Sequence, residues 1–406
     1  MMRRVLVSGG IAGVVAVLTT LPVFTQSASR GTIAATTPAL VVTAFNGEPA
    51  PANWTAPKTP WGEPDLQGVW SSDDATFGVS RGGFGRGGGA AAPTGLYLSD
   101  EQWAARQKQI QQGVTAGESA VGSFRGDFAR RSFRQTSYIV DPADGIQPQP
   151  LPQAFKRARG GDRGTFGDGP FNTFDDFTNY DRCITRGIWG SVIRVIYGNG
   201  NRIVQAPGMV AISYEMIHDT RVIYTDGRPH INNSIRQYLG DSRGWWEGDT
   251  LVVETTNLTG QTSIGANGNG LRHSDKMTMV ERIRRVADGI VQYQLTVIDP
   301  ETYPRPFTIS IPLTPLDGGV ILPYECHEGN GAVKNALTGE RAEERALAAD
   351  LERGFIRPRR GPQDDGLGAG AFGGQPRPRK GSPQAARGGG PGGRAGGPPA
   401  GGDQER

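Results

Sequence analysis

The sequence predicts an all-β fold, either a lipocalin-like antiparallel barrel or a compact sandwich, with minor flanking helices. Between residues 191 and 326, short segments rich in β-branched and aromatic residues follow one another at the spacing of antiparallel strands. Glycine-containing turns separate these segments, and Asp288–Gly289 is the strongest hairpin signal among them. No helical segments alternate with the strands, so a parallel sheet is not expected.

Residues 1–29 have the pattern of a secretory signal peptide. Arg3 and Arg4 precede an apolar run that ends near Phe24, and Ser29 completes a small-x-small cleavage site. The run is long for a signal peptide, which leaves an uncleaved membrane anchor as the alternative. We therefore predict export to the periplasm or the extracellular space, with no stable membrane insertion once the signal is removed.

Residues 30–60, rich in Thr, Ala and Pro, are predicted to be an extended lead-in to a β-rich domain over residues 61–356. Gly-Val-Trp at residues 68–70 is similar to the Gly-x-Trp that opens the first strand of lipocalin-type barrels. Ser99 begins a capping box, Ser-x-x-Gln, which predicts a helix that ends near Gly113. The Pro-, Gly- and Arg-rich residues that follow this helix are predicted to form an irregular N-terminal wrap.

The predicted strands share short length, β-type composition and a turn signal at their ends. They span residues 191–197, 202–206, 209–217, 221–225, 235–239, 250–258, 277–287, 290–298, 306–313 and 320–326. The turn-rich stretch 240–249 is predicted to connect two of them. A C-terminal helix is predicted from Thr338 to Gly354, because its composition favours helix and glycine can end it.

Low-complexity composition marks two further segments. Residues 357–406 form a Gly/Pro/Arg-rich tail with few large apolar side chains, so we predict that it is disordered. The Arg-Gly loop from Arg81 to Pro93 is predicted to be a solvated linker. Between the signal and residue 361 the charges nearly cancel, since the whole chain is +3 and Arg3, Arg4 and residues 361–406 together contribute +4. Nucleic acid and anionic membrane surfaces are therefore not expected partners.

Cys183 and Cys326 are the only cysteines of the chain. In an exported protein two cysteines more often pair than stay free, so we predict a disulfide. The bridge would close a loop around the whole β-rich region, which the chain-entropy account values at roughly 5 kcal/mol.

Several motifs together resemble those of an uncharacterised family of exported bacterial proteins. They are PDLQGVW (64–70), YEMIHD (214–219), DGRPH (226–230), GDSRGWWEGDTLVVETTN (240–257), VER (280–282) and YECHEGN (324–330). The resemblance covers roughly residues 61–344 and implies an exported bacterial β-domain. It implies no catalytic residues, because the family has no established activity.

Two histidines are the candidates for catalysis. His230 follows Pro229 in a turn, where loops at a barrel mouth commonly hold ligand contacts. His218 shares a strand face with Tyr214 if that segment is extended, and histidine titrates near neutral pH. Either could be a general base. The structural alternatives are a histidine that caps the loop at 230 and one hydrogen-bonded at a strand end at 218.

The candidate ligand-binding residues are Tyr214, Trp245, Trp246, His273 and His327. Trp245 and Trp246 point to opposite faces of an extended segment, so one is expected in the core and the other free to stack on a ligand. His273 lies beside Ser274, but residues so close in sequence rarely form a catalytic triad, and no G-x-S-x-G motif is present. Neither an H-x-H nor an H-E-x-x-H spacing occurs, so no metal site and no cofactor are predicted.

These observations favour an extracytoplasmic β-domain that binds a small, partly apolar molecule. The first alternative is a hydrolase, lyase or isomerase with a histidine general base, either cofactor-independent or metal-dependent. The second alternative is an envelope interaction protein that uses the Gly/Pro/Arg-rich tail.

Overall fold

The computed structural model describes residues 44–45, 48–49, 54–74, 95–117, 133–157, 171–195, 198–265, 268 and 270–355. All of them belong to one compact unit, Met1–Gly374. The predicted signal peptide, the Arg-Gly loop, the tail and most of the lead-in lie outside the described residues.

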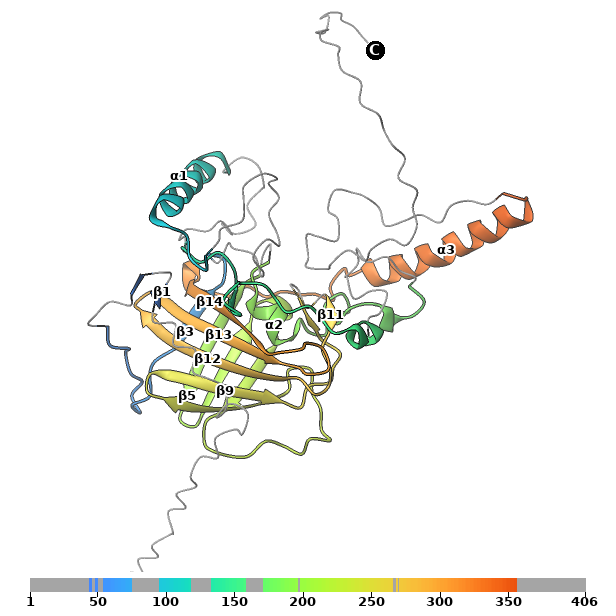
Figure 1. Cartoon of the computed structure of the whole chain (residues 1–406). Helices are drawn as coiled ribbons and strands as arrows, with labels where there is room; N and C mark the ends of the chain where they lie inside the picture. Colours follow the sequence, from blue (N-terminus) through green and yellow to red (C-terminus); the bar gives the residue numbers. More distant parts are fainter. Residues whose placement is uncertain are drawn as a thin grey trace, which may run out of the picture. The chain divides into compact units, whose positions relative to one another are not determined.

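Nine strands close into a β-barrel, which confirms the all-β barrel prediction (Figure 1). Their order around the wall is β13-β12-β9-β8-β7-β6-β5-β3-β14, and β14 pairs with β13 to complete the ring. The nine are β3 (Gly68–Ser71), β5 (Gly200–Ala206), β6 (Met209–Tyr214), β7 (Thr220–Tyr224), β8 (Asp241–Glu247), β9 (Thr250–Thr256), β12 (Thr278–Ala287), β13 (Ile290–Ile298) and β14 (Phe307–Pro315). A further short strand, β4 (Ile139–Asp141), pairs with β14.

The predicted hairpin at Asp288–Gly289 is confirmed, because β12 ends at Ala287 and β13 begins at Ile290. Two short pairs of strands lie outside the barrel wall. They are β1 (Ala44–Phe45) with β2 (Glu48–Pro49), and β10 (Ser263–Ile264) with β11 (Leu271–Arg272). Both are antiparallel.

One pair of neighbouring strands is parallel, so the prediction of a purely antiparallel barrel was wrong at this place. β7 and β8 pair only through Ile223 with Ser242 and Tyr224 with Arg243. Parallel neighbours require a long connection, which here is the segment 225–240. We call this segment the crossover. It contains turns and one isolated bridge, at Gln237, in place of the strand predicted at 235–239.

Four other strand predictions differ from the structure. Residues 187–192 form a short helix, α2 (Gly187–Val192), where a strand was expected to begin at 191. A short buried apolar run fits either structure, and only its packing decides. β6 ends at Tyr214, before a tight turn that includes η3 (Met216–His218). Residues 320–326 follow η5 (Asp317–Gly319) without forming a strand, and β8 occupies the stretch 240–249 that was predicted to be a turn.

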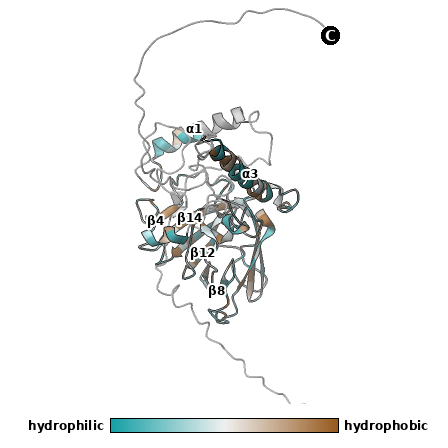
Figure 2. Cartoon of the chain, turned by 90° about the vertical axis from the view of Figure 1, so that its right-hand side faces the viewer, coloured by the Kyte–Doolittle hydropathy of each residue, from teal (hydrophilic) through white to brown (hydrophobic). Residues whose placement is uncertain are grey.

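The flanking helices confirm the predicted capping signals and extend beyond the predicted ends. α1 (Asp100–Gly117) begins after Ser99, whose Oγ accepts from the backbone N–H of Gln102 at 3.3 Å. α3 (Ala332–Glu352) begins one and a half turns before Thr338, and Gly354 follows it with φ of 75°. Apolar and hydrophilic residues both lie along α3 (Figure 2), and its buried Val333 packs with Phe171 and Phe177. The other short helices are η1 (Pro152–Arg157) and η2 (Phe174–Asp176).

The predicted disulfide between Cys183 and Cys326 is present, with Cα atoms 5.6 Å apart. It ties the segment before α2 to the segment before α3. No helix of the described residues has both the length and the apolar character needed to cross a membrane.

The barrel interior is mostly apolar and contains one buried charged pair. Alternate residues of each strand point inward and pack as a single core that includes Ile223, Leu251 and Val253. In this core Arg221 and Glu281 form an ion pair, with side chains 3 % and 0 % exposed. The hydroxyl of Tyr293 donates to Glu281 as well, at 2.5 Å.

Candidate functional site

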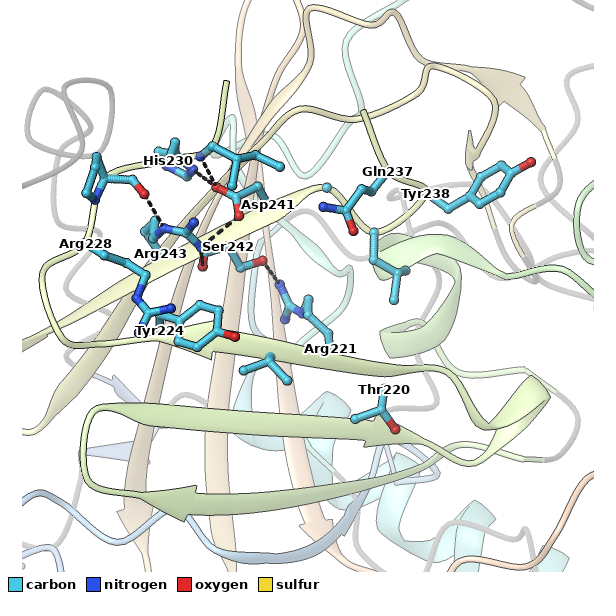
Figure 3. Close-up of a pocket in the computed structure, with 15 residues that line it drawn as sticks. Thr220, Arg221, Tyr224, Arg228, His230, Gln237, Tyr238, Asp241, Ser242 and Arg243 are labelled. Atoms are coloured by element: carbon cyan, nitrogen blue, oxygen red, sulfur yellow. Dashed lines mark hydrogen bonds and ion pairs between the residues drawn. The ribbon is translucent and has the colours of Figure 1, made fainter. Parts of the chain in front are cut away.

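A cavity of about 910 Å³ opens where β7 and β8 cease to pair. Because the register joins only the last residues of β7 to the first residues of β8, the wall is open between Thr220–Val222 and Gln237–Gly240. The crossover forms the remaining side. The lining residues are Thr220, Arg221, Val222, Tyr224, Arg228, Pro229, His230, Ile231, Gln237, Tyr238, Leu239, Gly240, Asp241, Ser242 and Arg243 (Figure 3).

The cavity reaches from the outer face of the wall to its inner face. Asp241 and Arg243 point outward from β8, while Ser242 points inward beside Arg221, whose Nη1 lies 3.5 Å from the Ser242 hydroxyl. The start of β8 is held close to β9, since a Cβ on Gly240 would lie 2.4 Å from the carbonyl oxygen of Thr256. Glycine is therefore required where the crossover becomes β8.

His230 lies between two carboxylates at the rim of this cavity. Its Nδ1 is 2.7 Å from Oδ2 of Asp241, and its Nε2 is 3.2 Å from Oε1 of Glu254. The same Oδ2 accepts the backbone N–H of Ile231 at 3.1 Å. Figure 3 shows the dashed line that joins His230 to Asp241, the first residue of β8. Through these two contacts the imidazole connects the crossover to β8 and β9.

The strand register explains why these carboxylates meet. Asp241 and Arg243 are alternate residues of β8, and Arg243 pairs directly with Glu254 of β9. Their side chains therefore share the outer face of the wall, opposite Leu251 and Val253 of the core. Asp241 and Glu254 are both almost fully buried, at 7 % and 4 % exposed.

The carboxylates favour the charged form of His230. Burial alone would lower the pKa of His230, but the hydrogen bonds and negative charges of Glu254 and Asp241 outweigh burial and raise it above the ordinary value. The ring therefore keeps its proton to a higher pH than an ordinary histidine. Its Nε2 is buried on the side of Glu254, so a proton acceptor role would require that nitrogen to leave the carboxylate.

Arg243 is fixed by three contacts and retains donors for a ligand. Its Nε donates to the carbonyl oxygen of Pro229 at 2.8 Å, and its Nη1 donates to that of Ser242 at 2.9 Å. Nη1 also lies 2.8 Å from Oδ1 of Asp241. Nη2 has no hydrogen-bond partner among the described residues. A guanidinium held in this way presents its remaining N–H groups in a fixed direction.

Tyr224 lies between Arg243 and a second arginine of the cavity. The Cζ of Arg228 lies 3.9 Å from the centroid of the Tyr224 ring, and the Cζ of Arg243 lies 5.4 Å from it. Arg228 is also paired with Asp226 through its Nε and Nη2. One aromatic ring thus contacts two cations at the outer end of β7.

Of the seven residues predicted for the site, only His230 lines this cavity. Tyr214 is 1 % exposed and lies in the apolar core. His218 is exposed in the turn after β6 and has φ of 47°, so it does not share a strand face with Tyr214. His327 is exposed next to the disulfide.

The two tryptophans point to opposite faces of β8, as expected for an extended segment. Trp246 packs against the barrel core, while Trp245 packs on the outer face with Val252 and Val280. The indole N–H of Trp245 donates to Glu247 at 3.0 Å. Both rings therefore have packing partners away from the cavity.

His273 is buried in a structural hydrogen-bond network. Its Nε2 lies 2.6 Å from the Thr262 hydroxyl, and its Nδ1 lies 2.7 Å from the carbonyl oxygen of Ser274. The Ser274 hydroxyl donates to Asp299 at 2.6 Å and makes no bond to the imidazole. Because burial lowers the pKa of His273 to about 4, the ring is neutral at pH 7. The geometry of a catalytic triad is absent from these residues.

Sequence reasoning missed Asp241, Arg243, Tyr224 and Arg228. A signal was present, because Asp241 and Arg243 alternate along one strand and Glu254 is placed to face them across a hairpin. The alternation of Asp241 and Arg243 is informative only if residues 241–247 are recognised as a strand, and they were predicted to be a turn.

Within the described part of the chain, no group of three His, Cys, Asp or Glu side chains is arranged to hold a metal ion. No protein family model, no curated protein and no solved structure matches this chain. The resemblance to the exported bacterial family therefore rests on its motifs and stays a prediction.

Proposed function

We propose that this protein is an extracytoplasmic binding protein for a small, partly apolar molecule that carries an anionic group. The observation that carries the proposal is the fixed guanidinium of Arg243 in the cavity, with Nη2 left for a ligand. The disulfide is consistent with an oxidising compartment outside the cytoplasm.

The lining offers more donors than acceptors. Four basic side chains line the cavity, Arg221, Arg228, His230 and Arg243, against one carboxylate, Asp241. Both oxygens of that carboxylate are already occupied by His230, Ile231 and Arg243. An incoming group is therefore met by N–H donors, which favours a carboxylate or phosphate over a cation.

The rest of the lining suits an organic ligand. Val222, Ile231 and Leu239 contribute aliphatic surface, and Tyr224 and Tyr238 contribute aromatic rings. A few polar groups among apolar side chains are the usual composition of a small-molecule site. The cavity volume also lies in the range of such sites, at about 910 Å³.

The catalytic alternative has less support from the geometry. A general base needs a nitrogen that can reach a substrate proton, whereas both ring nitrogens of His230 face carboxylates. The ring acts more naturally as a contact that holds the crossover against Asp241 and Glu254. The envelope interaction role depends on the tail, which lies outside the described residues.

A matched pair of probes tests the proposal. Benzoate is expected to raise the melting temperature of the protein in a concentration-dependent way, while benzamide, its uncharged analogue, leaves it unchanged. Arg243→Gln should abolish the benzoate shift. Arg305→Gln serves as the control, because Arg305 is exposed and does not line the cavity. Equal shifts with benzoate and benzamide, no shift with benzoate, or a full shift in Arg243→Gln would each overturn the proposal.

A further inference from the structure

The outer face of three neighbouring strands carries two rows of apolar side chains next to the cavity. In the first row Val204 of β5 pairs with Ala211 of β6, and Ala211 pairs with Val222 of β7. In the second row Ala206 pairs with Met209, and Met209 pairs with Tyr224. We call these six residues the apolar rows.

The apolar rows are accessible and not part of the core. Val204 is 48 % exposed, Val222 is 37 % exposed and Met209 is 36 % exposed. The residues between them in sequence, such as Ile203, Val210 and Ile223, point inward and are buried. Single exposed apolar residues are common on protein surfaces, but six in register across three strands make a continuous patch.

Both rows end at the cavity. Val222 and Tyr224, the β7 members of the two rows, are themselves lining residues. Tyr224 contacts Arg228 and Arg243, with Cζ atoms 3.9 Å and 5.4 Å from its ring centroid. An apolar surface therefore leads directly to two guanidinium groups. The neighbouring row on the other side, Arg202, Ser213 and Thr220, is polar and bounds the patch.

We infer that the ligand is an anionic amphiphile, whose acid group binds at Arg243 and Arg228 and whose alkyl chain lies across the apolar rows. This inference rests on the proposed function of the cavity and names its ligand class. Three strands at the usual spacing place the far row members about 10 Å from the near ones. That distance fits an alkyl chain of about eight carbons.

A chain-length series tests the inference. Butanoate, hexanoate, octanoate and decanoate are titrated below their micelle concentrations, and the dissociation constant is measured by calorimetry. Affinity is expected to rise about twofold per added methylene up to octanoate, since a chain on an open surface buries about half of each methylene. Beyond octanoate the gain should cease, because the chain then passes β5.

Substitutions in the apolar rows should change how the dissociation constant depends on chain length. They should leave the binding of the acid group unchanged. In the Val204→Ser and Met209→Ser variants, which lie outside the cavity lining, octanoate should lose most of its advantage over butanoate, while butanoate binds as in the parent. These residues are exposed, so the variants should fold. Ile146→Ser is the control, because Ile146 is similarly exposed, at 46 %, and lies outside the rows and the cavity.

The results that would contradict the amphiphile inference differ from those that would contradict the proposed function. If butanoate binds and depends on Arg243 but affinity is independent of chain length, the amphiphile inference is wrong and the proposed function stands. If no carboxylate of the series and no benzoate binds, both fail. If Val204→Ser leaves the chain-length dependence intact but changes the sedimentation of the free protein, the apolar rows are an interface between copies of the chain, and the inference is wrong.

Discussion

Arg221 and Glu281 form a bidentate ion pair inside the barrel, in which Nη2 of Arg221 lies 2.7 Å from Oε1 of Glu281. The pair joins β7 to β12 across the core, and Tyr293 of β13 donates to the same carboxylate. The charge of Glu281 raises the pKa of Arg221, so the guanidinium stays protonated although burial opposes it. The interior thus contains a buried charge pair, one member of which, Arg221, also lines the cavity.

Arg221→Met should destabilise the protein by about 3 to 5 kcal/mol, because it leaves the carboxylate of Glu281 buried without a counter-charge. Adding Glu281→Gln should recover much of this loss, since a neutral amide oxygen can still accept from Tyr293. Urea unfolding of the parent, the single variant and the double variant measures the difference. A double variant as unstable as the single one would show that the loss comes from packing and not from the unpaired charge.

Stability near neutral pH should depend on His230. Its folded pKa is raised, so the stabilisation is fully present below the ordinary histidine pKa of about 6.5 and is lost as the pH rises through the folded value. At pH 6, His230→Gln should cost on the order of 1 to 2 kcal/mol, because it removes the charge-assisted hydrogen bond to Asp241 and the ion pair with Glu254.

Urea unfolding of the His230→Gln variant at pH 6, 7, 8 and 9 checks this dependence. The difference in free energy of unfolding between the parent and the variant should become smaller towards high pH. His327→Gln changes an exposed histidine that contacts neither Asp241 nor Glu254. It should have the same free energy of unfolding as the parent at every pH. A gap that widens with pH would contradict a charged His230 in the folded protein.

Acid stability should depend on His273 with the opposite sign. Burial lowers its pKa to about 4, so the neutral ring stabilises the fold fully above pH 6.5. As the pH falls towards 4, the unfolded chain takes up the proton first, and roughly 3 kcal/mol is lost. Well below pH 6.5 His230 is protonated in both the folded and the unfolded chain and contributes no slope.

The free energy of unfolding of parent and His273→Gln is measured between pH 7 and pH 4. The variant should have a lower free energy of unfolding than the parent at pH 7. On acidification to pH 4, its free energy of unfolding should fall by roughly 3 kcal/mol less than that of the parent. Parallel curves for the two proteins would mean that acid unfolding is governed by carboxylates alone and that His273 does not take up a proton on unfolding.

The barrel was predictable from sequence wherever a strand has the usual strand composition and ends in a recognisable turn. The segment around Asp288–Gly289 is such a case, with two long runs of β-branched residues. β8 was missed because Gly244 lies in its middle and turn residues lie at both ends. The structure supplies the reason for that glycine, since a Cβ there would lie 2.8 Å from Cγ2 of Ile223 on the parallel neighbour.

The site was predictable only in part, because β8 was not recognised as a strand. His230 stood out because histidine next to Pro229 in a turn is an unusual local combination. Its partners could not be identified without the register that places Arg243 opposite Glu254. The parallel pairing of β7 with β8 depends on the path of the crossover, and local sequence carries little information about that path.

Two consecutive antiparallel meanders make up the barrel together with β3. One consists of β5, β6 and β7, and the other runs from β8 through β9, β12 and β13 to β14. They meet at the parallel contact, which has two paired positions and the His230 cluster, and on the other side β3 links β14 to β5. A molecule held in the cavity touches both meanders. Its binding energy would therefore strengthen the cohesion of the two halves and leave the internal stability of each half unchanged.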